Sequence, residues 1–253
     1  MPEEQGEIYQ ISSTVLGWQW FVEIVQAGTA SLFWSREWSP QFYVKLAKLG
    51  FITTAYELED PGSDSPPPAI LPILLPEIQK EYAVLDWQER HIGRTLRRWM
   101  KSQLCQRASY RLVVGCDLAE IVRGIRQSHQ TCWLIPEYEQ LLESLLQDSG
   151  DESFELLPIG LEADGGAMVA GEVGYRIGRT YTSLTGFMDR SDPSHNHAGK
   201  LQLHLLAEHL EASNYAFWNL GHPGMQYKLD LGARVLKRAD FLMRWQTAAQ
   251  EPL

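Results

Sequence analysis

Three strand-like segments joined by tight turns occupy residues 154–187, and they constrain the fold more than any other feature of the chain. Residues 154–161 and 167–175 flank the tetrapeptide Ala-Asp-Gly-Gly at 163–166. Asp-Gly between two strands is a strong signal for a hairpin. Gly178 and Arg179 punctuate the chain before a further strand at 180–187. This stretch therefore predicts antiparallel strands at the centre of a sheet.

Helices and strands alternate on both sides of this sheet. Downstream, we expect a Leu-rich amphipathic helix at 200–211, a strand at 215–220 and a short helix at 225–231 that ends at Gly232. Upstream, the same patterns predict strands at 82–87 and 110–114, and helices at about 93–103, 118–125 and 136–150. The fold class is therefore α+β, with helices layered on a mixed, mainly antiparallel sheet.

A segment rich in Pro, Ser and Asp, residues 59–69, is typical of a linker because it cannot hold a helix or a sheet ladder. We place the main boundary there. This predicts a small N-terminal α/β domain with its linker at 1–69 and a larger domain at 70–253. Within the first, Ser39 and Pro40 begin a helix that Gly50 ends, and residues 51–56 form a strand.

The charge of the chain is uneven. The formal net charge is −10, which argues against a nucleic-acid surface spread over the whole molecule. Residues 90–116 nevertheless contain no acid and carry a basic island: Arg90, Arg94, Arg97, Arg98, Lys101, Arg107 and Arg111. One interpretation is a local polyanion site, and the other is a solvated helix face balanced by acids elsewhere.

Other classes of protein are disfavoured by what the sequence lacks. No apolar run approaches the ~20 residues that cross a bilayer, and the acidic start differs from a secretory signal. Three cysteines without a Cys-x-x-Cys pair fit a reducing compartment, so we expect a cytoplasmic protein without membrane contact. No Walker loop, Rossmann fingerprint or His-Glu-x-x-His pair is present, and we expect no cofactor and no metal.

Residues 225–235, a short helix ending in Leu-Gly-Ala-Arg and entering a strand, resemble the last helix-turn-strand of the GNAT acyltransferase fold. A CoA-using member needs a Gly-rich turn at a helix start to meet the pyrophosphate. Residues 196–200 hold one glycine there, with Asp189 and Asp192 upstream. This departure makes an ordinary CoA-dependent acyltransferase the least favoured of the alternatives.

Over most of its length, the chain resembles one GNAT-like family, the leucyl/phenylalanyl-tRNA–protein transferases. The matching segments occur in the order of the family: residues 38–40, 50–52, 91–98, 132–134, 170–187, 198–200, 230–233 and 238–241. Such enzymes move an amino acid from aminoacyl-tRNA to the amino terminus of a protein. The resemblance thus implies a GNAT-like domain at 70–253, and it favours the basic island as a tRNA contact through Arg90, Arg94, Arg97, Arg98 and Lys101.

The departures from the family fall where its chemistry should be. Leu184, within residues 183–187, stands where the family has a carboxylate near the reacting amine, and Asn219 stands near the family's Asp-x-Gln. Asn219 is our catalytic candidate, because a neutral amide can polarise a carbonyl. Trp133 is a candidate for stacking on the terminal adenosine, and Tyr181 matches an aromatic beside the amino-acid pocket.

The predicted substrate-binding set is completed by Leu184, Thr185, Phe187 and Glu172. Glu172 aligns with an apolar pocket residue of the family, while strand alternation allows it to face either inward or the solvent. An inward Glu172 predicts a polar or cationic donor instead of Leu or Phe.

Two functions from different classes remain open on the sequence. The first is transfer of an amino acid, Leu, Phe or an altered donor, from aminoacyl-tRNA to a protein or peptide amino terminus, by a monomer. The alternative is a catalytically inactive GNAT-like module that binds a peptide terminus or a tRNA end. The lost carboxylates favour the second, and the order of the motifs favours the first.

Overall fold

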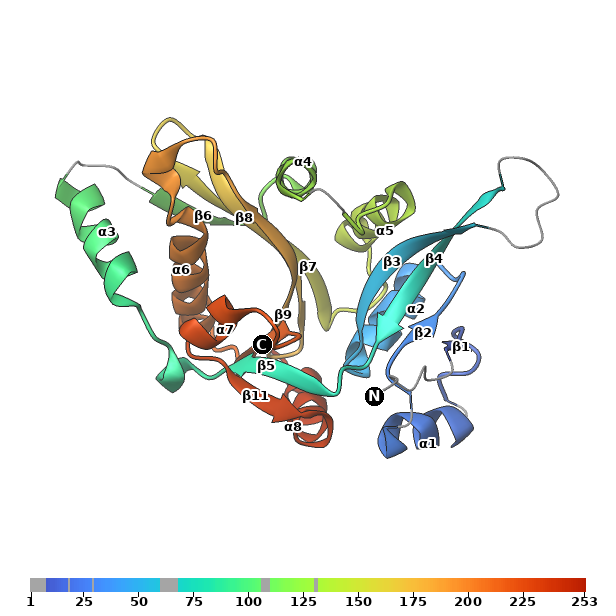
Figure 1. Cartoon of the computed structure of the whole chain (residues 1–253). Helices are drawn as coiled ribbons and strands as arrows, with labels where there is room; N and C mark the ends of the chain where they lie inside the picture. The colour runs from blue at the N-terminus through green and yellow to red at the C-terminus, as the bar shows by residue number, and fades with distance from the viewer. Residues whose placement is uncertain (1–7, 18, 29, 60–67, 106–109, 130–131) are drawn as a thin grey trace, which may run out of the picture.

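The computed structural model describes residues 8–17, 19–28, 30–59, 68–105, 110–129 and 132–253. This part of the chain forms a seven-stranded sheet with the order β11-β5-β10-β9-β8-β7-β6 (Figure 1). Its strands are β5 (Glu81–Leu85), β6 (Tyr110–Val114), β7 (Phe154–Ala163), β8 (Met168–Ile177), β9 (Thr180–Met188), β10 (Phe217–Gly221) and β11 (Arg234–Lys237). Neighbouring strands run antiparallel except β9 and β10, which are parallel. The predicted α+β class with a mixed, mainly antiparallel sheet is confirmed.

The centre of the sheet is the meander β7–β8–β9, as the turn signals predict. Gly165 and Gly166 both have positive φ (85° and 82°) in the turn between β7 and β8, a conformation that glycine adopts without steric cost. A parallel partner cannot follow β9 through a tight turn, so helix α6 (Ala198–Ala212) makes the crossover to β10. This order of hairpin, strand, helix and parallel strand is the GNAT-like arrangement expected from the sequence.

Helices cover the sheet on both faces. On one face, here called the α4 face, lie α4 (Leu118–Ser128) and α5 (Pro136–Gln147), while α6 and the more distant α3 (Arg94–Cys105) lie on the other, the α6 face (Figure 1). The largest cluster of buried apolar residues is on the α4 face and includes α8 (Arg238–Gln250). Smaller apolar clusters lie beneath α6. The shorter helices are η1 (Trp87–Glu89), η2 (Pro193–His195) and α7 (Gln226–Asp230).

The N-terminal part contains β1 (Tyr9–Gln10), α1 (Gln19–Ala27), β2 (Phe33–Trp34), α2 (Pro40–Lys48), β3 (Ile52–Glu59) and β4 (Ile70–Glu77). The predicted start of α2 is confirmed, because the Ser39 hydroxyl accepts a hydrogen bond from the Phe42 backbone N–H (3.3 Å). The strands β3 and β4 pair antiparallel along their whole length. The boundary predicted after Ala69 therefore separates two hydrogen-bonded strands, because the Pro-rich segment joins a hairpin. Residues 60–67 of that segment lie outside the described residues.

The apolar core is continuous between the N-terminal part and the larger sheet. The Tyr138 hydroxyl on α5 donates to the Thr53 carbonyl on β3 (2.7 Å), and the Tyr82 hydroxyl on β5 donates to the Gly50 carbonyl (3.0 Å). Arg238 of α8 donates to the carbonyls of Ile78 (2.7 Å) and Gln79 (3.0 Å), directly after β4. A division of the chain into two domains stays a prediction, and the pairing of β4 with β3 favours a boundary after β4.

Helices of the described residues are either too short or too polar to span a bilayer.

Candidate active site

A carboxyl group is buried at the centre of the sheet, on the α6 face. Glu172 of β8 is 4% exposed and points inward. Its Oε1 accepts hydrogen bonds from the hydroxyls of Tyr181 (2.8 Å) and Ser183 (2.7 Å), and its Oε2 accepts one from the Gln202 amide of α6 (3.3 Å). Burial raises the pKa of Glu172 to about 7, although all three hydrogen bonds act to lower it. This group is thus able to hold or release a proton near neutral pH.

Glycine makes room for this cluster. A Cβ on Gly174 would lie 2.3 Å from the Tyr181 hydroxyl and 2.5 Å from the Thr182 carbonyl oxygen. Gly174 therefore allows the Tyr181 ring to reach across β8 to Glu172. Ser183 extends the network, because its hydroxyl accepts a hydrogen bond from the indole N–H of the fully buried Trp218 (2.9 Å).

A second titratable group shares this buried layer. Lys228 of α7 is 6% exposed, and its ammonium donates to the His222 carbonyl (2.7 Å). Burial lowers the pKa of Lys228 to about 8, while the charge of Glu172 acts to raise it. Sequence reasoning missed Ser183, Gln202 and Lys228 as members of this site, because no motif or spacing marks them.

Asn219, the predicted catalytic residue, lies on the opposite face. Its Nδ2 donates to the Thr182 hydroxyl (3.2 Å), and its Oδ1 accepts from the Gly221 backbone N–H (3.0 Å). Tyr181 and Thr182 are consecutive on β9, so their side chains point to opposite faces of the sheet. The structure consequently does not bring Asn219 together with Glu172.

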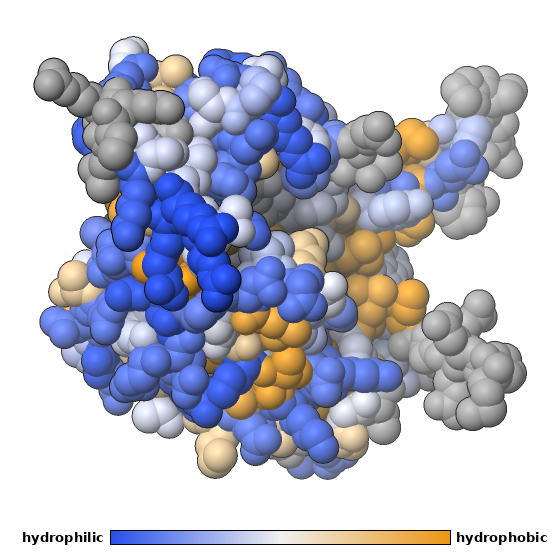
Figure 2. Space-filling model, turned by 60° about the vertical axis from the view of Figure 1, so that its left-hand side comes forward, coloured by the Kyte–Doolittle hydropathy of each residue, from blue (hydrophilic) through white to orange (hydrophobic). Residues whose placement is uncertain are grey.

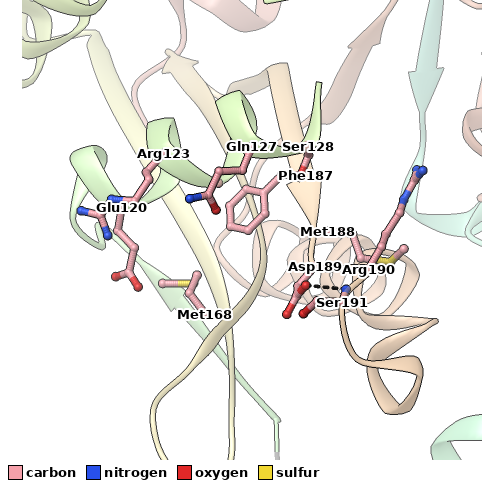
Figure 3. Close-up of a pocket in the computed structure, with 11 residues that line it drawn as sticks. Glu120, Arg123, Gln127, Ser128, Met168, Phe187, Met188, Asp189, Arg190 and Ser191 are labelled. Atoms are coloured by element: carbon pink, nitrogen blue, oxygen red, sulfur yellow. Dashed lines mark hydrogen bonds between the residues drawn. The ribbon is translucent and has the colours of Figure 1, made fainter. Parts of the chain in front are cut away.

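Three further predicted residues lie on the α4 face. Leu184 packs on the large apolar cluster, and Thr185 pairs with Val173. The ring of Phe187 lies against α4, where a Cβ on Gly124 would be 2.5 Å from it. Phe187 also lines a pocket of about 560 Å³ between α4 and the loop after β9 (Figure 3). Leu184 offers no group that could accept a proton from an amine.

Trp133, the predicted adenosine-stacking residue, precedes α5. Its ring meets Tyr138 edge-on, with 4.8 Å between the centroids, and it is partly buried against the large apolar cluster. The predicted substrate-binding residues are thus split, with Glu172 and Tyr181 on the α6 face and the rest on the α4 side.

The basic island forms a stripe on α3. Arg94, Arg97, Arg98 and Lys101 follow the spacing i, i+3, i+4, i+7, so they share one helix face, and all four are exposed. No ion pair to them occurs within the described residues. Figure 2 shows strongly hydrophilic side chains over this part of the surface. Arg90 differs, because it forms an ion pair with Glu211 (3.0 Å).

A pocket of about 330 Å³ lies beside this stripe, between the start of α3, α6 and α7. Arg94, Lys200 and Tyr227 are among its lining residues, and Tyr227 is the neighbour of Lys228. The described residues include no group of three or more His, Cys, Asp or Glu side chains placed to hold a metal ion.

The GNAT-like sheet, the crossover α6 and the basic helix define an acyltransferase-like α+β protein. The family model of leucyl/phenylalanyl-tRNA protein transferase matches residues 84–246, more than half of the chain. The chain therefore belongs to the leucyl/phenylalanyl-tRNA protein transferase family, whose general chemistry is aminoacyl transfer. No curated protein matches the chain.

Solved structures give weaker likenesses. The C-terminal domain of a putative lysylphosphatidylglycerol synthetase from Agrobacterium fabrum is 13% identical, with a TM-score of 0.39 over 89% of this chain and 73% of that one. L-PGS from Bacillus licheniformis is 13% identical, with a TM-score of 0.38 over 82% and 58% of the two chains. A tandem GNAT protein from the clavulanic acid biosynthesis pathway is 11% identical, with a TM-score of 0.34 over 87% and 68%.

Proposed function

We propose that this protein transfers an amino acid from an aminoacyl-tRNA to the amino terminus of a protein or peptide. The family match over residues 84–246 carries the proposal, because it includes the sheet, Glu172, Asn219 and the stripe on α3. The identity of the donor, Leu or Phe against an altered one, stays a prediction, as do the monomeric state and the cytoplasmic location.

Aminoacyl transfer from tRNA to an amine depends mainly on how the two reactants are positioned. The ester that joins an amino acid to tRNA is already activated, and an α-amino group with a pKa near ~8 is partly neutral at physiological pH. Holding ester and amine in line contributes several kcal/mol to the acceleration. Asn219 is the candidate to polarise the ester carbonyl, since its amide carries a second N–H besides the one given to Thr182.

An altered donor stays a prediction. Glu172 is buried, but its carboxyl accepts hydrogen bonds from Tyr181, Ser183 and Gln202 on the α6 face, apart from Asn219 and Leu184. Labelled Leu, Phe, Arg and Lys, each charged on its tRNA, can be offered with a peptide acceptor. Transfer of Arg or Lys above Leu and Phe supports the altered donor, and a plain preference for Phe contradicts it.

The catalytically inactive module is the second candidate, and Leu184 favours it. The side chain at this position is apolar and packs on the core, where the family has a carboxylate near the amine. The same transfer assay separates the two candidates. Retention of tRNA or peptide without transfer from any of the four charged tRNAs would establish the binding module.

The stripe on α3 predicts salt-dependent tRNA binding. Replacing Arg98 and Lys101 by Gln removes two exposed charges, and we expect the slope of log affinity against log salt to become shallower by about 2. A matched variant, Lys45→Gln with Lys237→Gln, removes two exposed charges outside α3 and should leave the slope unchanged. Equal slopes for the two variants would assign the stripe to solvation alone.

A further inference from the structure

The hairpin of β3 and β4 has one edge that is closed to a further strand. On the outer edge of β4, the backbone of Leu74 bonds to that of Ser35 in both directions, with its N–H donating at 2.9 Å and its carbonyl accepting at 3.0 Å. Pro72 and Pro76, which have no N–H to donate, follow the same alternation as Leu74. Proline on an edge strand is a known protection against strand pairing. The outer edge of β4 is therefore unsuited to a partner.

The far end of β3 has no such protection. The register pairs Glu57 with Pro72, two places from Leu74. Leu74 turns its backbone groups away from β3, so by alternation Glu57 and Glu59 turn theirs away from β4. Both glutamates are exposed, and within the described residues these backbone groups have no hydrogen-bond partner. The open edge begins after Ala55, which is 3% exposed.

The side chains of this open end differ between the two faces of the hairpin. Tyr56 (55% exposed) and Leu58 (39% exposed) lie on one face, together with Leu71. Glu57 and Glu59 lie on the other face. Figure 1 shows the far ends of β3 and β4 projecting away from the seven-stranded sheet. A strand added to this edge would meet apolar side chains on one face and carboxylates on the other.

Charge decides which strand can be added. Residues 49–79 contain five acids and no Lys, Arg or His. Within the described part of the chain, neither Glu57 nor Glu59 forms an ion pair. Opposite charges directly across two strands contribute about 0.2–1 kcal/mol, whereas like charges destabilise the pair. A second copy of β3 paired antiparallel would set its own acids against these, so the edge selects a basic strand.

We propose that residues 56–59 of β3 bind a partner protein by strand addition, and that the bound segment alternates Lys or Arg with apolar residues. The backbone of the segment pairs with the outward groups of Glu57 and Glu59, and its cations face the two carboxylates. Its apolar side chains pack on Tyr56 and Leu58. In such sites the backbone hydrogen bonds supply affinity, and the alternate side chains supply specificity.

Short peptides, blocked at both ends and titrated into the full chain, test the proposal. A peptide of alternating Lys and Val should bind about tenfold more tightly than one of alternating Glu and Val. It should exceed by a similar factor a peptide of the same composition in which all Lys residues precede all Val residues, because only the alternating order separates the two faces. Equal binding of the three peptides overturns the proposal.

Charge reversal at the edge sharpens this test. Glu57→Lys combined with Glu59→Lys should invert the preference, so that the peptide of Glu and Val binds better. The matched control is Glu152→Lys with Asp240→Lys, which makes the same change at two exposed acids outside the hairpin and should keep the preference. If both double variants invert it, or neither does, the edge of β3 is not the site.

Amide hydrogen exchange on the unmodified protein tests the strand pairing itself. Bound peptide should slow exchange about tenfold at Glu57 and Glu59, whose N–H groups face outward. Exchange at Tyr56 and Leu58, whose N–H groups face β4, should stay as it is. Unchanged exchange at the two glutamates contradicts strand addition. Sedimentation without peptide covers the other occupant, since a dimer that Leu58→Lys dissociates would assign the surface to a second copy and also overturn the proposal.

Discussion

The two faces of the central sheet differ in the kind of side chain that they bury. On the α6 face, Glu172, Lys228 and His204 are each at least 94% buried. On the α4 face, the corresponding layer is apolar, with Leu184 and Phe187 packed against it. The faces diverge within one dipeptide, since Tyr181 bonds to Glu172 on one side and Thr182 bonds to Asn219 on the other.

The positions that align with the family's catalytic residues and the buried titratable groups lie on different faces of the sheet. Residues aligned with the family's carboxylate and Asp-x-Gln lie on the α4 face, where Leu184 and Asn219 carry no charge. The buried carboxyl and ammonium groups, Glu172 and Lys228, are on the α6 face instead. Burying a carboxyl group is costly unless it is hydrogen-bonded, so the three donors around Glu172 are needed for folding whatever else they do. Four predictions test the contrast between the faces.

The largest expected effect is on stability, from Glu172→Ala. The change leaves the donors of Tyr181, Ser183 and Gln202 without their acceptor, and we expect a loss of about 4 kcal/mol in the free energy of unfolding. Leu184→Ala, on the other face, should cost about 2 kcal/mol, because that side chain is only partly buried. Denaturant titration measures both. Equal losses would mean that the polar layer is no more critical than the apolar one.

The polar layer also predicts how stability depends on pH. The pKa of Glu172 is about 7 in the folded protein against an ordinary 4.5, so the unfolded chain releases this proton first. Its contribution is full below pH 4.5 and is lost as the pH rises to about 7, about 3 kcal/mol in all. Lys228 has the opposite effect. Its pKa is about 8 in the folded protein against an ordinary 10.5, so stability rises as the pH rises from about 8 to 10.5.

Unfolding free energies measured from pH 4 to pH 11 test this pH dependence, which Glu172 and Lys228 set. Glu172→Gln keeps an acceptor oxygen but does not ionise, so it should remove the loss of stability between pH 4.5 and 7. Because the charge of Glu172 acts to raise the pKa of Lys228, the variant should also lower that pKa and deepen the rise of stability at alkaline pH. Parallel curves for the variant and the unmodified protein would show that the pKa of Glu172 is the same in the folded and the unfolded chain.

The α4 face makes a prediction about activity. If Asn219 polarises the ester carbonyl, Asn219→Ala should lower kcat by about 10²-fold. Thr182→Val removes the hydrogen-bond partner of Asn219, and a contact with Tyr175, but keeps the Asn219 amide and should leave most of the activity. Unchanged kinetics in Asn219→Ala, with the fold intact by circular dichroism, would remove Asn219 from the mechanism.

The smallest effects come from neighbouring residues of β9. Ser183→Ala removes one donor to Glu172 and the acceptor of Trp218, and we expect a cost of about 2 kcal/mol. Thr182→Val removes one acceptor on the other face and should cost about 1 kcal/mol. Thermal unfolding ranks the two, and the reverse order would contradict the distinction between the faces.

Local signals in the sequence predicted the central elements well. The Asp-Gly turn, the cap at Ser39 and the periodicity of α6 depend on nearby residues, and each lies where it was expected. The linker prediction was different. Its composition predicts a break in regular structure, yet Glu59, its first residue, is the last residue of β3, and composition cannot show that the flanking strands pair with each other.

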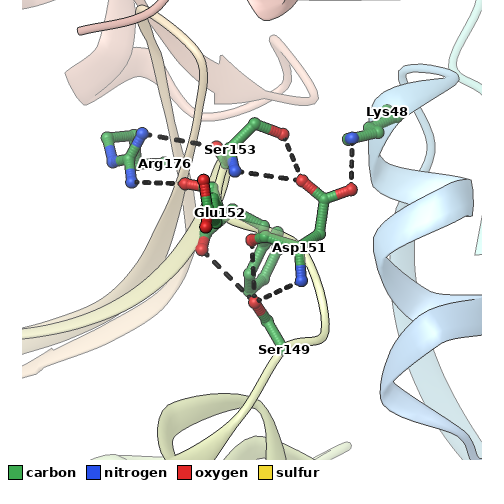
Figure 4. Close-up of polar contacts among 7 residues, drawn as sticks. Lys48, Ser149, Asp151, Glu152, Ser153 and Arg176 are labelled. Carbon is green, nitrogen blue, oxygen red and sulfur yellow. Dashed lines mark hydrogen bonds and ion pairs between the residues drawn. The ribbon is translucent and has the colours of Figure 1, made fainter.

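Long-range contacts hold the N-terminal part against the sheet. Lys48 of α2 forms an ion pair with Asp151, whose carboxylate also accepts hydrogen bonds from Ser153 (Figure 4). Lys48 and Asp151 are about a hundred residues apart in the sequence, and no local pattern joins them. The burial of His204 could have been predicted from its spacing. It lies three residues after Leu201 and three before Ala207, on the buried side of α6.

The sequence alone determined most elements of the larger sheet and the basic stripe, because these follow from periodicity and turn chemistry between near neighbours; it did not predict α1, α8, β1, β2 or β4. Only the tertiary structure decided that Glu172 faces inward, that Asn219 lies on the other face, and that Lys228 and His204 share a layer beside a pocket. A strand's alternation gives two faces but not which one each side chain takes, and that choice is made by the helices that pack on the sheet.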